Sequence, residues 1–122
     1  MEKEDYLETI YKLKQEKGYI RVSDIAEALK ITKPSVSQMC RRLEDEGCLI
    51  CETYKPIQLT KKGQAIGKKI ADRHEVLEQF LTFLQIPAKT REKDIHGMEH
   101  CLSEITLKKL KELTIKLRSA KN

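Results

Sequence analysis

The sequence lacks tryptophan and has only three prolines, five glycines and 5% aromatic residues among its 122 residues. With 35% charged and 39% hydrophobic residues, this scarcity predicts a soluble, helix-rich protein and excludes a disordered or fibrous chain. No apolar run approaches the roughly eighteen residues of a membrane span. The first residues, "MEKEDYLE", are acidic where a signal peptide would be basic and then apolar, so we expect a cytoplasmic protein whose four cysteines are reduced.

Charge is distributed unevenly along the chain, although the net charge is +5. Residues 1–60 carry a net charge of −1, whereas residues 61–122 carry +6. Within the first half, the window 30–42 contains four cations and no acid, and a second basic window covers residues 55–73. These local windows predict contact with a phosphate backbone, as in a nucleic-acid-binding protein.

Three helices are predicted in the first fifty residues. Apolar residues recur at helical spacing over residues 3–16 and stop at Gly18. The segment "RVSDIAEALK" predicts a short second helix with Ser23 as its N-cap. A third helix is expected to begin at Thr32, with Pro34 in its first turn, and to end at Gly47.

The next segment predicts a small β-hairpin, or wing. "CLICET" and "QLT" are typical of strands, and the turn between them contains Pro56. Two short helices followed by a hairpin indicate a winged helix-turn-helix DNA-binding domain over residues 1–62, whose last helix enters the major groove. In that orientation we expect base contacts from Ser35, Ser37 and Gln38, and phosphate contacts from Lys33, Arg41, Arg42 and Lys55.

The second half predicts only helices. A long linking helix is expected from about residue 63 to 86, a second around 89–101, and a last one capped by Ser103. The fold class is therefore mainly α with a small β-wing, with a helical domain over residues 63–122. Helices this amphipathic need a partner surface, which we expect to be a second copy of the chain in a homodimer.

The stretch "HGMEH" at residues 96–100 has the His-x-x-Glu-His spacing of inverted zinc peptidases. On a helix this spacing places both histidines on one face with Glu99 beside them. A peptidase needs a further downstream glutamate ligand, and the printed sequence has only Glu104 and Glu112 as acids after His100. The peptidase is therefore a remote alternative, and we predict that the chain is not an enzyme.

Six potential metal ligands are spread over three predicted helices. Taken singly, His74 would be a core histidine, and the acids of the first helix would be an ordinary solvated turn. Together they supply three imidazoles and three carboxylates, which suit Mn, Fe, Co, Ni or Zn better than Mg or Ca. The candidate ligands are Asp5, Glu8, His74, His96, Glu99 and His100. Cys48 and Cys51 have zinc-finger spacing, but on a strand they would point to opposite faces.

Three stretches resemble the diphtheria toxin repressor family of metal-dependent transcriptional regulators, and more closely its manganese transport regulator branch. These are "GYIRVSDIAEALKITKPSVSQMCRRLEDEG", "LTKKGQAIGKKIADRHEVLEQFL" and "GMEHCLSE". The resemblance implies a homodimer that binds a palindromic double-stranded operator through its winged helices. It also implies that a divalent metal favours the DNA-binding state, with repression of metal-uptake genes as the usual outcome.

The resemblance also assigns the ligands residue by residue. Asp5 and Glu8 match two carboxylates of the manganese branch, His74 matches a histidine ligand, and Glu99 and His100 match the pair in the "GxEHxLS" signature. His96 departs from the family, because the manganese branch has a glutamate there that bridges two ions and the iron branch has a cysteine. We therefore expect one tightly held ion instead of two, or a preference for Fe, Co, Ni or Zn over Mn.

One alternative trigger remains open at this stage. A winged-helix regulator could respond to a small organic effector or to oxidation of its thiols instead of a metal. The thiols concerned would be those of Cys40, Cys48, Cys51 and Cys101.

Overall fold

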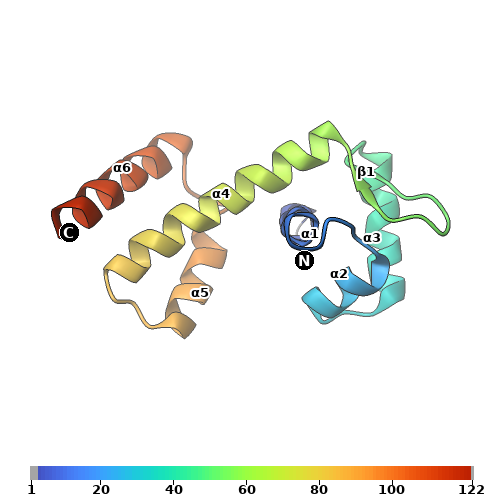
Figure 1. Ribbon diagram of the computed structural model, residues 1–122, viewed down its shortest axis with the longest axis horizontal. Helices are drawn as coiled ribbons and strands as arrows, with labels where there is room; N and C mark the ends of the chain where they lie inside the picture. The colour runs from blue at the N-terminus through green and yellow to red at the C-terminus, as the bar shows by residue number, and fades with distance from the viewer. Residues whose placement is uncertain (1–2, 122) are drawn as a thin grey trace. The chain divides into compact units, whose positions relative to one another are not determined.

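A computed structural model of the protein describes residues 3–121 and shows six helices and one two-stranded sheet in that range (Figure 1). The predicted fold class, mainly α with a small β-wing, is confirmed. The chain divides into two compact units, Met1–Ala71 and Asp72–Asn122. Helix α4 (Lys61–Phe83) contributes its first half to one unit and its second half to the other.

The first unit packs three helices around one apolar core. These are α1 (Lys3–Lys17), α2 (Val22–Leu29) and α3 (Lys33–Asp45). Side chains without any exposed surface come from all three helices, from the segment between α1 and α2, and from the segment between α3 and β1: Leu7, Ile10, Ile20, Ile25, Val36, Leu43 and Cys48. The apolar periodicity in the sequence thus predicted the buried faces correctly.

Helix α3 begins where its sequence predicts. Thr32 is the N-cap and accepts a hydrogen bond from the Ser35 amide at 3.3 Å, while Pro34 occupies the first turn. The predicted cap of α2 is wrong, because Ser23 lies inside the helix and Arg21 is the N-cap. The Arg21 amide donates instead to the Asp24 carboxylate at 2.9 Å, so an acid in the first turn replaces the expected serine.

The wing is a short antiparallel hairpin, as predicted. Strand β1 (Leu49–Ile50) pairs with β2 (Gln58–Leu59), with Leu49 opposite Leu59. The Ile57 amide donates to the Ile20 carbonyl at 2.7 Å, which ties the base of the hairpin to the segment between α1 and α2. The wing is therefore anchored at its base, whereas its tip at Tyr54 is 97% exposed.

Glycine allows α1 and the first half of α4 to pack closely. A Cβ atom on Gly67 would lie 2.6 Å from the Leu7 carbonyl oxygen and 2.8 Å from Cβ of Tyr11. A Cβ atom on Gly63 would likewise collide with the Cys48 carbonyl oxygen. Any larger residue at Gly67 would force the two helices apart, which makes this position a fixed point of the first unit.

The second unit consists of the end of α4, α5 (Ala88–Met98) and α6 (Glu104–Lys121). Its core contains Leu77, Leu81, Ile95 and Leu107. Arg91 links α5 back to α4, because its side chain donates to Glu78 Oε1 at 3.0 Å and to the Ile86 carbonyl at 2.8 Å. Ser103 caps α6, as predicted, by accepting from the Thr106 amide at 3.2 Å.

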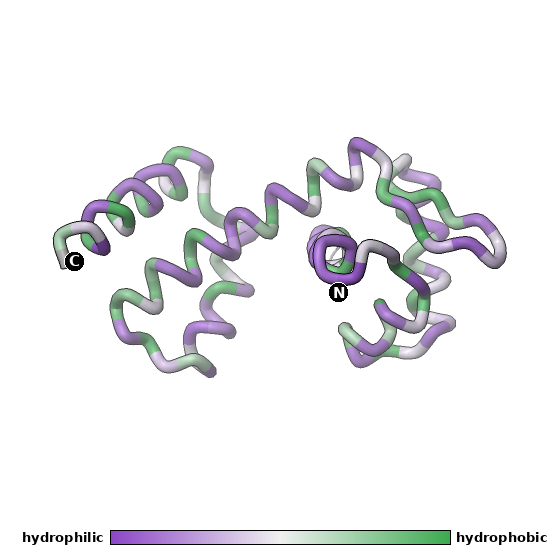
Figure 2. Tube along the Cα trace, viewed as in Figure 1, coloured by the Kyte–Doolittle hydropathy of each residue, from purple (hydrophilic) through white to green (hydrophobic). Residues whose placement is uncertain are grey.

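Helix α6 presents apolar side chains on more than one face, and hydrophobic and hydrophilic residues alternate along it in Figure 2. Leu107 and Thr114 are buried against the rest of the unit, whereas Ile105, Leu113 and Ile115 are exposed by 45–74% in the single chain. In the described part of the chain, no helix combines the length and apolar composition required to cross a membrane.

Candidate metal centre

Glu99 is the central residue of the candidate site. It is the C-cap of α5, where its amide still donates to the Ile95 carbonyl at 2.9 Å, and only 2% of its surface is exposed. A buried carboxylate costs several kcal/mol unless charged or hydrogen-bonding partners surround it. The groups that face this carboxylate therefore indicate what the site can hold.

Two imidazoles face the two oxygens of Glu99. His74 Nδ1, from α4, lies 3.1 Å from Oε2, and His100 Nε2, from the turn after α5, lies 3.5 Å from Oε1. All three residues belong to the second unit. Two ring nitrogens and a carboxylate at these separations match the donor set that divalent transition metals prefer.

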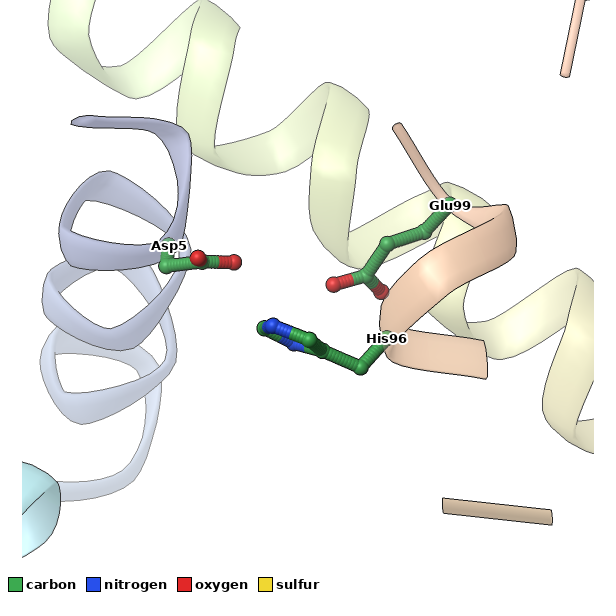
Figure 3. A group of neighbouring side chains, drawn as sticks. All are labelled: Asp5, His96 and Glu99. Carbon is green, nitrogen blue, oxygen red and sulfur yellow. The ribbon is translucent and has the colours of Figure 1, made fainter. Parts of the chain in front are cut away.

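His96 extends the same cluster from the last turn of α5. Its ring is edge-on to that of His100, with centroids 6.0 Å apart and an angle of 85° between the planes. Its side chain is exposed, and it offers a nitrogen within 4.8 Å of a Glu99 oxygen. In Figure 3 the side chains of His96 and Glu99 extend from the same side of this segment, so both can reach one ion.

Arg73 holds the backbone around His100 in place, and this residue was not identified from the sequence. Its Nη1 atom donates to the carbonyl oxygens of Glu99 at 3.0 Å and Leu102 at 2.8 Å. The guanidinium therefore fixes the backbone on either side of His100 without using the Glu99 carboxylate. Its position next to His74 on α4 is the only signal in the sequence, and it does not reveal carbonyl partners 26 and 29 residues away.

The two candidate ligands of the first unit, Asp5 and Glu8, lie one turn apart on α1. Asp5 and Glu8 are three residues apart, which places both carboxylates on one helix face, and Figure 3 shows Asp5 projecting from this helix. Glu8 Oε2 forms an ion pair with Lys12 Nζ at 2.9 Å, one turn further along. A cation that binds Glu8 must therefore compete with this ammonium group.

The cysteines do not extend the cluster. Cys48 is fully buried in the first unit, and Cys51 lines a cavity together with Cys40. Cys101 is exposed and follows His100. Within residues 3–121, the groups of possible metal ligands contain only histidine and carboxylate side chains, so we find no support for a zinc-finger site at Cys48 and Cys51.

The predicted DNA-contacting residues occupy the outer side of α3 and the wing. Most are exposed: Lys33, Ser35, Gln38, Arg41, Arg42 and Lys55. Ser37 is half-buried, and the Ser35 hydroxyl accepts a 2.9 Å hydrogen bond from the Thr32 hydroxyl. Lys55 pairs with Glu52 at 2.9 Å. The positive side chains on α3 are thus available to phosphate, and the role of each residue stays a prediction.

Two family models match consecutive parts of the chain. The model described as "Iron dependent repressor, N-terminal DNA binding domain" matches residues 1–57. The model described as "Iron dependent repressor, metal binding and dimerisation domain" matches residues 60–119. Four of the six candidate ligands, all those of the second unit, fall within the second match.

A relative similar in sequence is the HTH-type transcriptional regulator MntR of Bacillus subtilis (strain 168). It is 46% identical over 110 residues, which are 90% of this chain and 78% of the relative. The relatives matched at this level are transcriptional regulators, not enzymes, which confirms that prediction and removes the zinc peptidase as an alternative.

Solved structures agree. The metal-dependent transcriptional regulator MtsR superposes with a TM-score of 0.81 at 26% identity, covering 92% of this chain and 53% of that chain. The manganese regulator SloR gives 0.76 at 30% identity, covering 91% and 52%. The chain thus spans about half the length of these solved chains. By its sequence and both domain matches, it belongs to the iron-dependent repressor family of metal-responsive, DNA-binding transcriptional regulators, as its motifs predicted.

Proposed function

We propose that the chain represses metal-uptake genes when a divalent transition metal of the Mn or Fe class is bound. The observation that carries the proposal is the buried Glu99 carboxylate with an imidazole opposite each oxygen. A core histidine would need only one hydrogen-bond partner. Here two imidazoles converge on one buried carboxylate, and a third imidazole, that of His96, lies beside them. Stability of the fold does not require so many metal-binding groups at one place.

Both units contribute ligands in this proposal. The proposed set is Asp5, Glu8, His74, His96, Glu99 and His100. Support comes from the convergence of the four residues of the second unit and from the position of the two acids on one face of α1. Glu8 would exchange Lys12 for the metal, which replaces one positive partner with a stronger one.

We propose that each chain binds a single metal ion. A carboxylate has two oxygens and can bridge two metals, whereas a neutral imidazole offers one free nitrogen and binds one. With His96 at this position the site also has one anionic ligand fewer than with glutamate. Both effects favour one ion and the borderline metals Fe, Co, Ni and Zn over Mn.

The regulatory step follows from the split ligand set. Residues of α1 and residues of the second unit can ligate the same ion only in arrangements that bring them together. Ligation therefore selects those arrangements from the ensemble and holds the DNA-binding units of a homodimer in one geometry. A dimer related by a two-fold axis fits a palindromic operator, with one α3 in the major groove of each half-site.

In this geometry we propose that Ser35, Ser37 and Gln38 contact base edges. Lys33, Arg41, Arg42 and Lys55 would contact phosphates. The exposure of the α3 cations supports the second group. The Ser35 hydroxyl is already engaged with Thr32, which makes Gln38 the strongest candidate for sequence discrimination. We also propose that the DNA-binding domain covers residues 1–62 and that the helical metal-binding and dimerisation domain covers residues 63–122.

Selection of bound sequences from a random duplex pool, with and without Mn or Fe(II), tests the function. We expect one enriched, palindromic sequence with metal and no enrichment in chelator. Fluorescence anisotropy on that duplex then measures the affinity. Equal enrichment with and without metal would show that the protein binds DNA but that metal does not regulate this binding.

Metal stoichiometry tests the role of His96 separately. Calorimetric titration of metal-free protein should give one Mn per chain, and His96→Glu should give two, with Mn affinity raised about tenfold relative to Zn. Glu92→Gln, an exposed α5 residue outside the cluster, is the control and should behave as wild type. Two Mn per wild-type chain would contradict the proposal.

A further inference from the structure

Two thiols from different elements of the first unit are in contact. Cys40 lies on α3 and is 4% exposed, whereas Cys51 follows β1 in the wing and is half-buried. The Cys51 thiol lies close enough to Cys40 to raise its pKa, and both side chains line the same cavity between α3 and the wing. Cys51 is three residues from Cys48 in the sequence, but in the fold it shares a cavity with Cys40.

The backbone around Cys51 is held in place for this contact. The Cys51 amide donates to Glu44 Oε2 at 2.9 Å, and Glu44 lies one turn after Cys40 on α3. The first residue beyond β1 is thus attached to α3 by its amide, one turn away from Cys40. A disulfide between Cys40 and Cys51 requires their sulfurs to approach to about 2 Å.

The pair is also accessible to small molecules. Both cysteines line a cavity of about 500 Å³ between α3 and the wing, together with Ser37, Arg41 and Lys55. The other two cysteines differ from this pair, because Cys48 is fully buried and Cys101 is exposed without a neighbouring thiol among the described residues. The cavity therefore brings solvent to the one place where two thiols already meet.

We propose that Cys40 and Cys51 are an oxidisable pair, which a peroxide converts into a disulfide joining α3 to the wing. The Cys51 thiolate attacks one peroxide oxygen, the O–O bond breaks, and the departing hydroxide takes up a proton as water. This leaves a sulfenic acid on Cys51. The Cys40 sulfur then attacks the Cys51 sulfur, gives up its proton, and the S–O bond breaks to release a second water. The two thiols together lose two electrons, which reduce the peroxide.

The environment sets the order and the speed of these steps. Burial, followed by the Cys51 and Glu44 neighbours, raises the pKa of the Cys40 thiol to about 12, so Cys40 remains protonated and acts second. Burial and the Glu44 carboxylate also raise the pKa of Cys51. The pair therefore reacts slowly at neutral pH and responds to sustained oxidant, not to traces.

The disulfide would affect the surface proposed to contact DNA. Arg41 and Lys55 lie on opposite sides of the cavity and both are proposed to contact phosphates. Drawing Cys51 toward α3 changes the distance between these two cations, which a fixed phosphate spacing does not tolerate. We expect oxidation to weaken binding to duplex DNA by about fivefold or more, equivalent to losing one phosphate contact.

Peptide mapping of the full chain tests the bond directly. Protein in chelator is treated with hydrogen peroxide, alkylated with N-ethylmaleimide and digested with trypsin. Cys40 falls in peptide 31–41, Cys48 and Cys51 in peptide 43–61, and Cys101 in peptide 94–108. We expect a disulfide between the first two peptides, with fragmentation placing it at Cys51, and its loss on treatment with dithiothreitol. Recovery of Cys40 and Cys51 in alkylated form, or a bond to Cys48, would overturn the proposal.

DNA binding of variants tests the consequence. In Cys51→Ser, peroxide should leave the affinity for duplex DNA unchanged, whereas Cys101→Ser should lose affinity on oxidation as the wild type does. If Cys51→Ser fails to fold, wild-type protein oxidised and then reduced supplies the comparison, and its affinity should return to the starting value. A mapped disulfide with unchanged DNA affinity would overturn the link to DNA binding.

Discussion

Replacing Glu99 by glutamine removes the negative charge of the proposed metal site while keeping the size of the side chain. In wild type each carboxylate oxygen has an imidazole opposite it, at 3.1 Å for His74 and 3.5 Å for His100. The amide retains one acceptor oxygen but places an NH₂ group opposite the other ring. Without metal we expect the free energy of unfolding to fall by about 1 kcal/mol, the net contribution of one hydrogen bond.

With metal the difference should be much larger. We expect the loss of a charged ligand to weaken affinity by about 100-fold, or roughly 2.7 kcal/mol. At a metal concentration of about 100 times the wild-type Kd, wild type gains about 2.7 kcal/mol of stability and the variant only about 0.4 kcal/mol. For a chain of this size this corresponds to a rise in Tm of about 11 °C for wild type and about 2 °C for the variant.

Thermal unfolding followed by circular dichroism, in chelator and with added Mn or Zn, measures both effects. Glu92→Gln makes the same chemical change on an exposed part of α5 and should keep the full metal-induced shift. If Glu99→Gln showed the same metal-induced shift as wild type, Glu99 would not be a ligand and the proposed centre would be wrong.

Three further predictions follow from the first unit and from α5. Gly67→Ala should destabilise the protein by about 1–3 kcal/mol, because the new Cβ meets the Leu7 carbonyl, whereas Gly97→Ala has open space and should be neutral or stabilising in chemical denaturation. Asp24→Asn should cost about 0.5–1 kcal/mol at pH 7. The Lys17 side chain and the Arg21 amide lower the pKa of Asp24, so this stabilisation is present above its ordinary value of 3.8 and is lost as pH falls below it; wild type and variant should therefore converge at low pH. Arg41→Ala should weaken all duplexes about equally and Gln38→Ala should change base preference in a binding-site selection; an unchanged preference for Gln38→Ala would refute its assignment.

The sequence predicts most of the fold because its signals are local. The cap at Thr32 with Pro34 behind it and the stop at Gly18 each act within a few residues, and the structure confirms both. The hairpin is also confirmed, but its turn is closed by the Lys55 amide donating to the Glu52 carbonyl, and Pro56 follows that turn. The cap of α2 was predicted wrongly because two local signals compete there. Ser23 has the right side chain, but Asp24 reaches back to the Arg21 amide and starts the helix earlier.

The candidate site could be predicted only in its chemistry. The types and spacing of the histidines and acids indicate a transition-metal site, yet no spacing shows that His74 meets Glu99 across 25 residues. Arg73 was missed because it acts on backbone carbonyls, which leave no trace in a sequence. The thiol pair escaped for a similar reason. Cys48 and Cys51 are close in the chain, whereas the contact of Cys51 with Cys40 requires the wing to fold back on α3.

The central claim is that metal at this centre and DNA on α3 are energetically coupled. Coupling must be reciprocal, so the most direct test measures it from both sides with the selected duplex. We predict that Mn, Fe(II), Co, Ni or Zn tightens DNA binding by about tenfold or more, that DNA tightens binding of that metal by the same factor, and that Glu99→Gln abolishes both. Equal DNA affinity in chelator and in every one of these metals would contradict the account.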